Sequence, residues 1–289
     1  MPRGLDHVVH AVRDLDAAAA FYQRLGFTVG APNRHPWGTH NRIVQLPGFF
    51  IEILAVEDPA KIVPPGLRAF SFGAFQQEFL ARHQGLSMLL LEGRDAAADA
   101  AAFRANHMGD FAPFEFAREG RGPDGATVKL AFSLAFAADP KCPEIGFATC
   151  HHRFPENFWN PTFQRHANTA DRVAAVVMVA ENPADHHIFL SALADQRDLT
   201  ARSSGVTVPT AHGDIQVMPP AAYAQQFGLA APDLARGPRL AALRFVVRDF
   251  SAAVTCLQGA HVPAAVHMGR IVVGPQAAFG AAIVIEPAP

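Results

Sequence analysis

The chain has 289 residues, about half of them hydrophobic, which is enough apolar sequence for one large core or two ordinary ones. Its 24 lysines and arginines nearly balance its 26 aspartates and glutamates, so the net charge of −2 provides no basic face for nucleic acid. The longest apolar stretches, such as residues 173–180, are far shorter than the roughly 20 residues that cross a membrane. We therefore expect neither nucleic acid nor a membrane among its partners.

The cysteines and the N-terminus bear on the cellular compartment. Cys142, Cys150 and Cys256 form no CxxC pair, and three cysteines cannot all pair within one chain. The first residues lack the apolar segment of a signal peptide. We therefore expect a cytoplasmic protein without a disulfide scaffold.

The N-terminal segment contains the clearest succession of elements. A strand is expected at residues 5–12, a helix at residues 17–25, and extended segments at residues 27–30, residues 42–46 and Phe49–Val56. Asp14 or Asp16 can cap the helix, and Gly26 can end it. This order predicts a β-α-β-β-β unit.

The same unit recurs along the chain. As Arg13-Asp14 follows the first strand, three further short apolar strands are followed by Arg94-Asp95, Glu181-Asn182-Pro183 and Arg248-Asp249. Each of these signals precedes an alanine-rich helical stretch, at residues 97–107, 184–194 and 251–258. The alternative to a repeat is a coincidence of short apolar strands.

Two such modules should make one domain, because the curved sheet of one module leaves an apolar face that a second must cover. The segment 155–164 breaks both the helical and the strand periodicity with prolines, asparagines and aromatic residues. Four modules therefore predict two domains, residues 1–158 and residues 159–289.

Several motifs carry a family resemblance. They are Leu5-Asp6-His7-Val8-Val9, Val12-Arg13-Asp14-Leu15-Asp16, Phe21-Tyr22 and Leu25-Gly26-Phe27. Together they resemble the opening of the vicinal oxygen chelate (VOC) superfamily, which includes glyoxalase I, extradiol dioxygenases and bleomycin-resistance proteins. Two later motifs resemble its glyoxalase-like domain branch, namely His35-Pro36-Trp37-Gly38-Thr39 with Asn41, and Cys150-His151-His152 leading to Trp159 and His166.

The resemblance implies an α+β fold of paired βαβββ modules, with four modules in two tandem VOC domains. Their curved mixed sheets surround a cavity, which in active members holds a divalent metal bound by side chains of the first and last strands. The metal could be iron, manganese, zinc or nickel, since spacing alone does not separate them.

His7 and Glu52 are the first two candidate metal ligands. His7 lies in an apolar strand, where a lone histidine is more often a packed core residue, but the resemblance places the family's first ligand at this position. Glu52 lies between Phe50 and Leu54 on a strand whose two faces are both apolar, so its carboxylate needs a cation or hydrogen bonds. The family's carboxylate ligand lies on this same strand.

The third candidate comes from the Cys150-His151-His152 cluster. Adjacent strand residues face opposite sides, so at most one of the two histidines enters the cavity. The resemblance favours His152, with His151 as the alternative. Met88 stands where many relatives have a further ligand, and a thioether binds hard divalent ions poorly. The predicted set of two histidines and one carboxylate leaves positions open for water and substrate.

Other polar and aromatic residues are candidates for binding a substrate. Trp37, Thr39 and Asn41 lie beside the proposed metal site, and Trp159 and His166 follow the third ligand strand. Each could equally be a loop-packing residue. The sequence contains no HExxH, GxSxG, P-loop or helix-opening GxGxxG motif.

The pair His186-His187 lies on a predicted helix, and the sequence suggests no carboxylate partner for it. It is most simply a surface or core pair. In the second half of the chain, Ala174 and Ala242 occupy the positions that correspond to His7, so this half is predicted to lack a metal site of its own.

Two functions of different classes are open. In the first, the protein is a glyoxalase-like enzyme that binds a small substrate through two adjacent oxygens to a divalent metal, with lyase, isomerase or dioxygenase chemistry. In the second, it is a metal-free protein of the bleomycin-resistance type that sequesters a small molecule in a cavity lined by some of its 23 phenylalanines. Both predict a small-molecule partner, and both are compatible with a homodimer.

Overall fold

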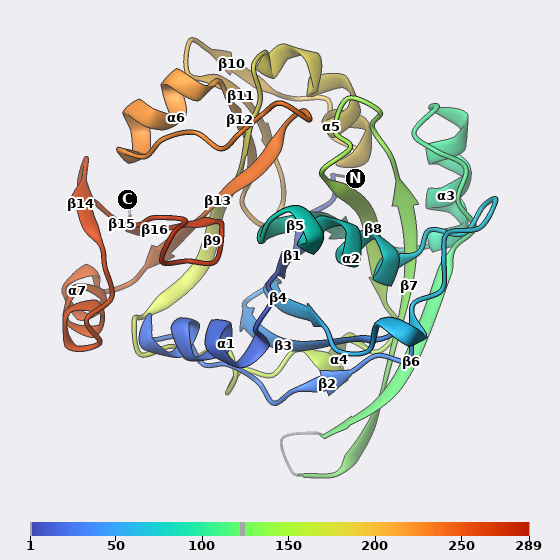
Figure 1. The fold of residues 1–289 in the computed structure, drawn as a ribbon, viewed down its shortest axis with the longest axis horizontal. Coiled ribbons are helices and arrows are strands. Elements are labelled where there is room, and N and C mark those ends of the chain that lie inside the picture. Colours follow the sequence, from blue (N-terminus) through green and yellow to red (C-terminus); the bar gives the residue numbers. More distant parts are fainter. Residues whose placement is uncertain (1, 122–124, 289) are drawn as a thin grey trace.

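Four modules of the same order, a strand, a helix and three strands, form most of the computed structural model, which describes residues 2–121 and 125–288 (Figure 1). The first contains β1 (Leu5–Ala11), α1 (Leu15–Arg24), β2 (Asn33–Arg34), β3 (Thr39–Leu46) and β4 (Phe49–Val56). The second contains β5 (Gly85–Glu92), α3 (Ala96–Ala105), β6 (Phe114–Arg121), β7 (Thr127–Ala137) and β8 (Gly146–His152). The third contains β9 (Ala170–Val179), α5 (His187–Leu193), β10 (Thr200–Arg202), β11 (Gly205–Pro209) and β12 (Asp214–Met218). The fourth contains β13 (Arg239–Val247), α7 (Phe250–Gly259), β14 (Ala265–His267), β15 (Arg270–Val273) and β16 (Ala282–Pro287).

The strand pairing repeats with the modules. In each module the first strand pairs in parallel with the last, that is β1 with β4, β5 with β8, β9 with β12 and β13 with β16. The modules join in twos through antiparallel pairs of first strands, β1 with β5 and β9 with β13. One further antiparallel pair, Leu240 with Leu86, connects the two halves into a single sheet of 16 strands. The predicted α+β fold of paired modules with curved mixed sheets is confirmed.

The repeated acidic signals act as helix caps, as the sequence predicts. The carboxylates of Asp14 and Asp249 accept hydrogen bonds from the backbone N–H groups three residues later, and Asp95 accepts from both Ala97 and Ala98. In the third module the cap is Asn182, which accepts from the N–H of Ala184 and starts the 3-10 turn η2 (Pro183–Asp185) before α5.

Four shorter or inserted helical elements lie outside the module pattern. They are η1 (Pro59–Lys61), α2 (Phe72–Arg82), α4 (Pro155–Phe158) and α6 (Pro220–Phe227). The helix α2 was not predicted from the sequence. Ser71 caps it, and its buried residues have helical spacing, namely Phe72, Gln76, Phe79 and Leu80. None of the helices in the described ranges is long and apolar enough to cross a membrane.

The prediction of an extended strand-like segment at residues 27–30 is wrong. The backbone N–H of Thr28 donates to His166 Nδ1 and its hydroxyl donates to Arg165 O, both in a loop. The N–H of Gly30 donates to Ile43 O on β3, but residues 27–30 form no strand there. The second strand of the first module is instead β2, which pairs with Asn41 and His40 on β3. The predicted boundary at residues 158 and 159 falls directly after α4 and stays a prediction.

Both faces of β1 and β4 pack against hydrophobic side chains. Phe49, Ile51 and Ile53 of β4 belong to the main hydrophobic core, whereas Leu54 packs with Val9 and Met88 in a second cluster. Both faces of β4 are therefore covered, as predicted. Residues two apart on a regular strand share a face, but Leu5 and His7 do not, because the pairing of β1 with β5 is irregular between them. Leu5 enters the main core, and His7 faces a cavity.

Candidate functional site

A cavity lies in the first half of the chain, bounded by β1, β3, β4, β6 and β7. The surrounding atoms leave about 580 Å³ of empty space, including the solvent at its mouth. Its wall is mostly aromatic, formed by Trp37, Phe50, Phe72, Phe114, Phe116, Phe132 and Phe158. Its polar or ionisable groups are His7, His35, Asn41, Glu52, Arg118 and Cys150. An apolar cavity with a few convergent polar groups is the usual form of a small-molecule site.

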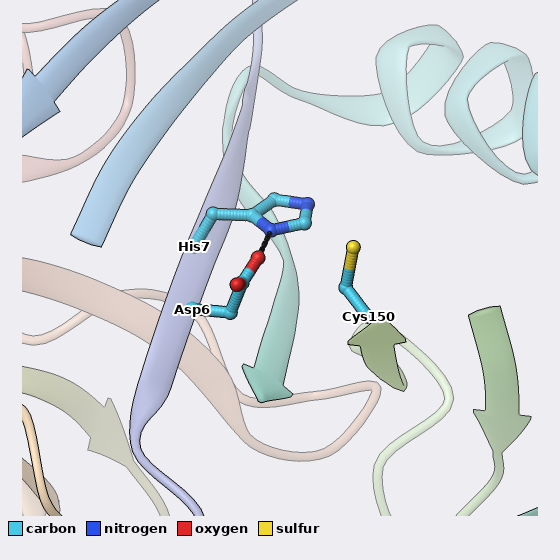
Figure 2. A group of neighbouring side chains, drawn as sticks. All are labelled: Asp6, His7 and Cys150. Atoms are coloured by element: carbon cyan, nitrogen blue, oxygen red, sulfur yellow. Dashed lines mark hydrogen bonds and ion pairs between the residues drawn. The ribbon is translucent and has the colours of Figure 1, made fainter. Parts of the chain in front are cut away.

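His7 is held so that one ring nitrogen faces the cavity. The ring stacks on Phe50, with centroids 4.2 Å apart, and Nδ1 hydrogen-bonds to the Asp6 carboxylate (Figure 2). Because an ionised carboxylate only accepts hydrogen bonds, Nδ1 carries the proton. The other ring nitrogen, Nε2, lies 4.0 Å from Glu52 Oε2. A neutral histidine oriented by a carboxylate in this way is suited to bind a metal.

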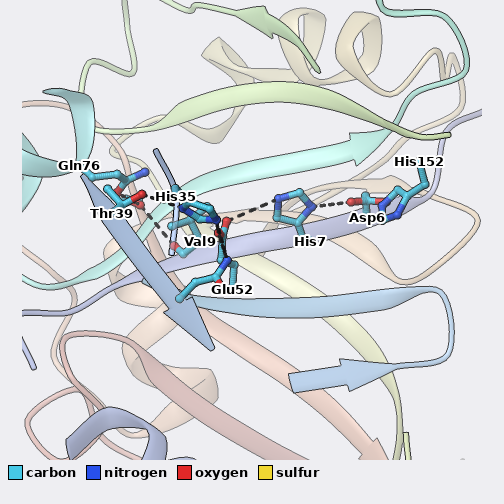
Figure 3. A network of polar contacts seen from close by, with 10 residues as sticks. Asp6, His7, Val9, His35, Thr39, Glu52, Gln76 and His152 are labelled. Carbon is cyan, nitrogen blue, oxygen red and sulfur yellow. Dashed lines mark hydrogen bonds and ion pairs between the residues drawn. The ribbon is translucent and has the colours of Figure 1, made fainter. Parts of the chain in front are cut away.

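The Glu52 carboxylate is buried, and His7 and His35 both lie close to it (Figure 3). Asn41 Nδ2 donates to Glu52 Oε1 over 2.6 Å and lies 3.2 Å from His35 Nε2. His35 Nε2 is 3.9 Å from Glu52 Oε1, and its Nδ1 bonds to the Thr39 hydroxyl over 2.8 Å. Burial lowers the pKa of His35, against the opposing effect of the Glu52 charge, so its ring is neutral at pH 7.

His152 reaches His7 only through Asp6. Its Nε2 lies 2.9 Å from Asp6 Oδ2, and its ring stacks on Trp159 outside the cavity wall. Burial opposes ionisation of Asp6, but the charges and hydrogen bonds of His152 and His7 outweigh this and hold the pKa of Asp6 well below its usual range. His151 and His152 both line a separate outer cleft. The structure therefore brings His7 and Glu52 together and places His152 behind Asp6.

Closely spaced ligating groups occur at two places in the described residues. Asp6, His7 and Cys150 have ligand atoms within 4.8 Å of one another, as do Asp139, Cys142 and His186. At the first place, burial and then the negative charges of Asp6 and Glu52 hold the pKa of the Cys150 thiol well above its usual range. Cys150 is therefore a neutral neighbour of His7.

The predicted substrate-binding residues separate into two groups. Trp37 and Asn41 line the cavity, and Thr39 contacts it indirectly through His35. Trp159 lies against His152 at the outer cleft. His166 is away from the cavity, because both of its ring nitrogens bond to backbone groups, Nε2 to Gln45 O and Nδ1 to the N–H of Thr28. In this structure His166 is a buried histidine whose two ring nitrogens both hydrogen-bond within the protein.

Three polar residues of the site were not predicted from the sequence: Asp6, His35 and Arg118. The alternation of Phe114, Phe116 and Arg118 along β6 could have indicated Arg118, because residues two apart share a face of a strand. Burial lowers the pKa of Arg118, and the nearby Glu52 charge opposes that shift. Arg118 is the cation nearest to the aromatic wall of the cavity and can receive an anionic group.

Comparisons with known proteins agree with this architecture. A family model described as a glyoxalase-like domain matches residues 5–194. No curated protein matches the chain. Among solved structures, a hypothetical protein from Staphylococcus aureus is 13% identical with a TM-score of 0.69, over 98% of this chain and 99% of that one.

Two further solved structures share the fold at low identity. A mutant of 4-hydroxymandelate synthase from Streptomyces coelicolor is 13% identical with a TM-score of 0.55, over 99% of this chain and 93% of that one. A xylose isomerase-like TIM barrel/4-hydroxyphenylpyruvate dioxygenase fusion protein is 16% identical with a TM-score of 0.53, over 91% of this chain and 40% of that one. At these identities the likeness concerns the fold alone.

Proposed function

Because this chain belongs to the glyoxalase-like domain family of the VOC superfamily, we propose that it is a metal-dependent enzyme for a small oxygen-bearing substrate. The substrate would enter the aromatic cavity and bind a divalent metal through two adjacent oxygens. The observation that carries the proposal is the 4.0 Å approach of His7 Nε2 to Glu52 on the neighbouring strand β4, while Asp6 holds the other nitrogen of His7. Lyase, isomerase and dioxygenase reactions all fit such a site.

Two of the donor atoms have a spacing close to that of ligands on one divalent ion. Ligands bound at about 2.0–2.2 Å lie roughly 3–4 Å from one another, and His7 Nε2 lies 4.0 Å from Glu52 Oε2. We propose His35 as the third ligand, because its Nε2 lies 3.9 Å from the other carboxylate oxygen, Glu52 Oε1. The three residues do not form a group with all donor atoms within 4.8 Å of one another, so their side chains would close around the ion as it binds. Asn41, which donates to Glu52, would then release His35 to the ion. In this arrangement His152 orients Asp6, in place of the ligand role predicted from the sequence.

The protein groups have separate tasks in such a reaction. A bound ion would act as a Lewis acid that stabilises negative charge on a substrate oxygen. Asp6 fixes the ring and the tautomer of His7. Arg118 can pair with an anionic group of the substrate, and the aromatic wall excludes water around the reacting atoms.

Elemental analysis of protein purified without chelator tests the proposal. The parent protein should hold at least one equivalent of divalent metal, and Glu52→Gln and His35→Gln should each contain one equivalent less than the parent. His152→Gln should retain metal with lower affinity, because His152 acts through Asp6. Loss of metal in His152→Gln but not in His35→Gln would restore His152 as the ligand. A parent protein with far less than stoichiometric metal would overturn the metalloenzyme.

A second function is favoured by one observation. Asn41 donates to Glu52 over 2.6 Å, and Arg118 interacts electrostatically with the same carboxylate, so the buried charge is compensated without a metal. This supports a metal-free binding protein of the bleomycin-resistance type. In that case an aromatic ligand should raise the melting temperature, and added metal should leave it unchanged.

A further inference from the structure

A second cluster of ligating side chains lies outside the cavity, between β7 and the start of α5. Cys142 Sγ lies 3.4 Å from Asp139 Oδ2 and 3.4 Å from His186 Nδ1. The remaining pair, His186 Nδ1 and Asp139 Oδ2, is 3.5 Å apart. One sulfur, one nitrogen and one oxygen therefore form a nearly equilateral triangle. Cys142 and His186 are buried, with 2% and 5% of their surfaces exposed.

The triangle has the dimensions of one face of a tetrahedral metal site. With bonds of about 2.0–2.1 Å to nitrogen or oxygen and about 2.3 Å to sulfur, neighbouring tetrahedral ligands lie roughly 3.3–3.6 Å apart. Hydrogen bonds from His186 to the sulfur and from the thiol to Asp139, together with the ion-pair contact of His186 Nδ1 with Asp139 Oδ2, hold the three donors at this spacing. The donors therefore already have the spacing that a bound cation requires. We propose that Asp139, Cys142 and His186 bind a thiophilic divalent cation of the zinc class.

The local backbone holds the three donors in place. The N–H of Cys142 donates to Asp139 O over 2.8 Å, and this tight turn sets the two side chains next to each other. The N–H of Lys141 donates to Asp139 Oδ1 over 2.9 Å, which turns Oδ2 toward the sulfur. His186 follows the turn η2, where its N–H donates to Pro183 O. Asp139 is thus the carboxylate partner of His186 that the sequence did not suggest.

The donor types select the metal class. Cysteine binds as the thiolate, so its proton leaves to solvent when the cation binds. A thiolate with an imidazole and a single carboxylate favours zinc over the hard ions calcium and magnesium, which prefer all-oxygen sites. Three protein donors leave the fourth tetrahedral position to a water molecule.

The position of the cluster gives the cation a structural role. Asp139 and Cys142 belong to the segment between β7 and β8 in the first half of the chain, whereas His186 belongs to the third module. Near this junction the Phe147 and Phe189 rings also pack together, with centroids 4.8 Å apart. A cation bound here would link the first half of the chain to the second. Because it binds the folded chain preferentially, it should raise the melting temperature.

Titration of the full chain with Co²⁺ tests the site, because a thiolate bound to Co²⁺ gives a sulfur-to-metal absorption band in the near ultraviolet. The parent protein should show this band, and Cys142→Ser and His186→Gln should lose it. Cys256→Ser is the matched control, since Cys256 lies outside both ligating clusters, and it should keep the band. Glu52→Gln should also keep it, so the result is independent of the function proposed for the cavity.

Other results would overturn the proposal. Absence of the band from the parent protein, or its persistence in Cys142→Ser, would exclude the cluster as a thiolate site. Loss of the band in Cys150→Ser with retention in Cys142→Ser would place the metal beside His7 instead. Should Cys142→Ser fail to fold, the increase in melting temperature on adding Zn²⁺ is compared between the parent and His186→Gln. An equal increase in the two proteins would also reject the site.

Discussion

Acidification should destabilise the protein through His10, in the middle of β1. The side chain is fully buried, and its ring nitrogens contact the Tyr22 hydroxyl at 2.8 Å and the Phe279 carbonyl at 3.0 Å. A carbonyl only accepts hydrogen bonds, so Nε2 carries the proton and Nδ1 accepts from Tyr22. Burial lowers the pKa of His10 to about 4, because a charged ring would lose its solvent.

The size of the effect follows from the two pKa values. The unfolded chain protonates this ring near its ordinary pKa of 6.5, and the folded chain does so only near 4. Because the folded pKa is the lower one, the stabilisation is complete above pH 6.5 and is lost as the pH falls toward 4. A difference of one proton changes the free energy of unfolding by about 1.4 kcal/mol per pH unit, so about 2.5 kcal/mol is lost between pH 7.5 and pH 4.5.

Urea unfolding of the parent and of His10→Gln at pH 7.5 and pH 4.5 measures how much of the free energy of unfolding depends on the protonation of His10. Glutamine stays neutral, so the variant is less stable at pH 7.5 but should lose about 2.5 kcal/mol less than the parent on acidification. Other titrating groups, such as His83, are present in both proteins and cancel in the comparison. Equal losses in the two proteins would refute a neutral, buried His10.

Three further predictions concern the cavity and the junction of the halves. Glu52→Gln should contain one equivalent of metal less than the parent in elemental analysis and leave the melting temperature of the metal-free protein near that of the parent, because the apolar faces of β4 are unchanged. Unchanged metal content would remove Glu52 from the site. Asp6→Asn should weaken metal affinity about 10- to 100-fold in a chelator competition, because His7 loses its orienting carboxylate. An unaltered affinity would contradict this role. Gly85→Ala should lower the free energy of unfolding in urea by more than about 1 kcal/mol, because φ is +140° and the new Cβ would lie 3.0 Å from Gly280 O. A neutral effect would show that the junction can shift.

The repeated module was readable from the sequence because its signals are local. Asp14, Asp95 and Asp249 each cap a helix within three residues, and each follows a short apolar strand. The helix α2 was missed because it lies between modules and has no counterpart in the repeat. The segment 27–30 was predicted to be a strand, but Thr28 bonds to a loop more than 100 residues later in the chain, and only Gly30 donates to β3.

Only some residues of the candidate site could be predicted from the sequence, for a geometric reason. Glu52 lies on the regularly paired strand β4, where the position of a residue gives its direction, and His7 was identified by its place in a motif of the family. The irregular pairing of β1 between Leu5 and His7 breaks the alternation and allows Asp6 to contact both histidines. His35 reaches the cavity from a turn, and no periodicity in the sequence predicts such a position.

The outermost strands of the sheet determine how another chain could approach it. In the described residues β2, β6, β10 and β14 pair on one side only, and three of them have two or three residues. The longer β6 carries Glu115, Arg118 and Glu119. Short or charged edges offer few free backbone groups for strand addition. These edges therefore disfavour edge-to-edge pairing of two such sheets, and β6 is the longest edge that a second chain could meet.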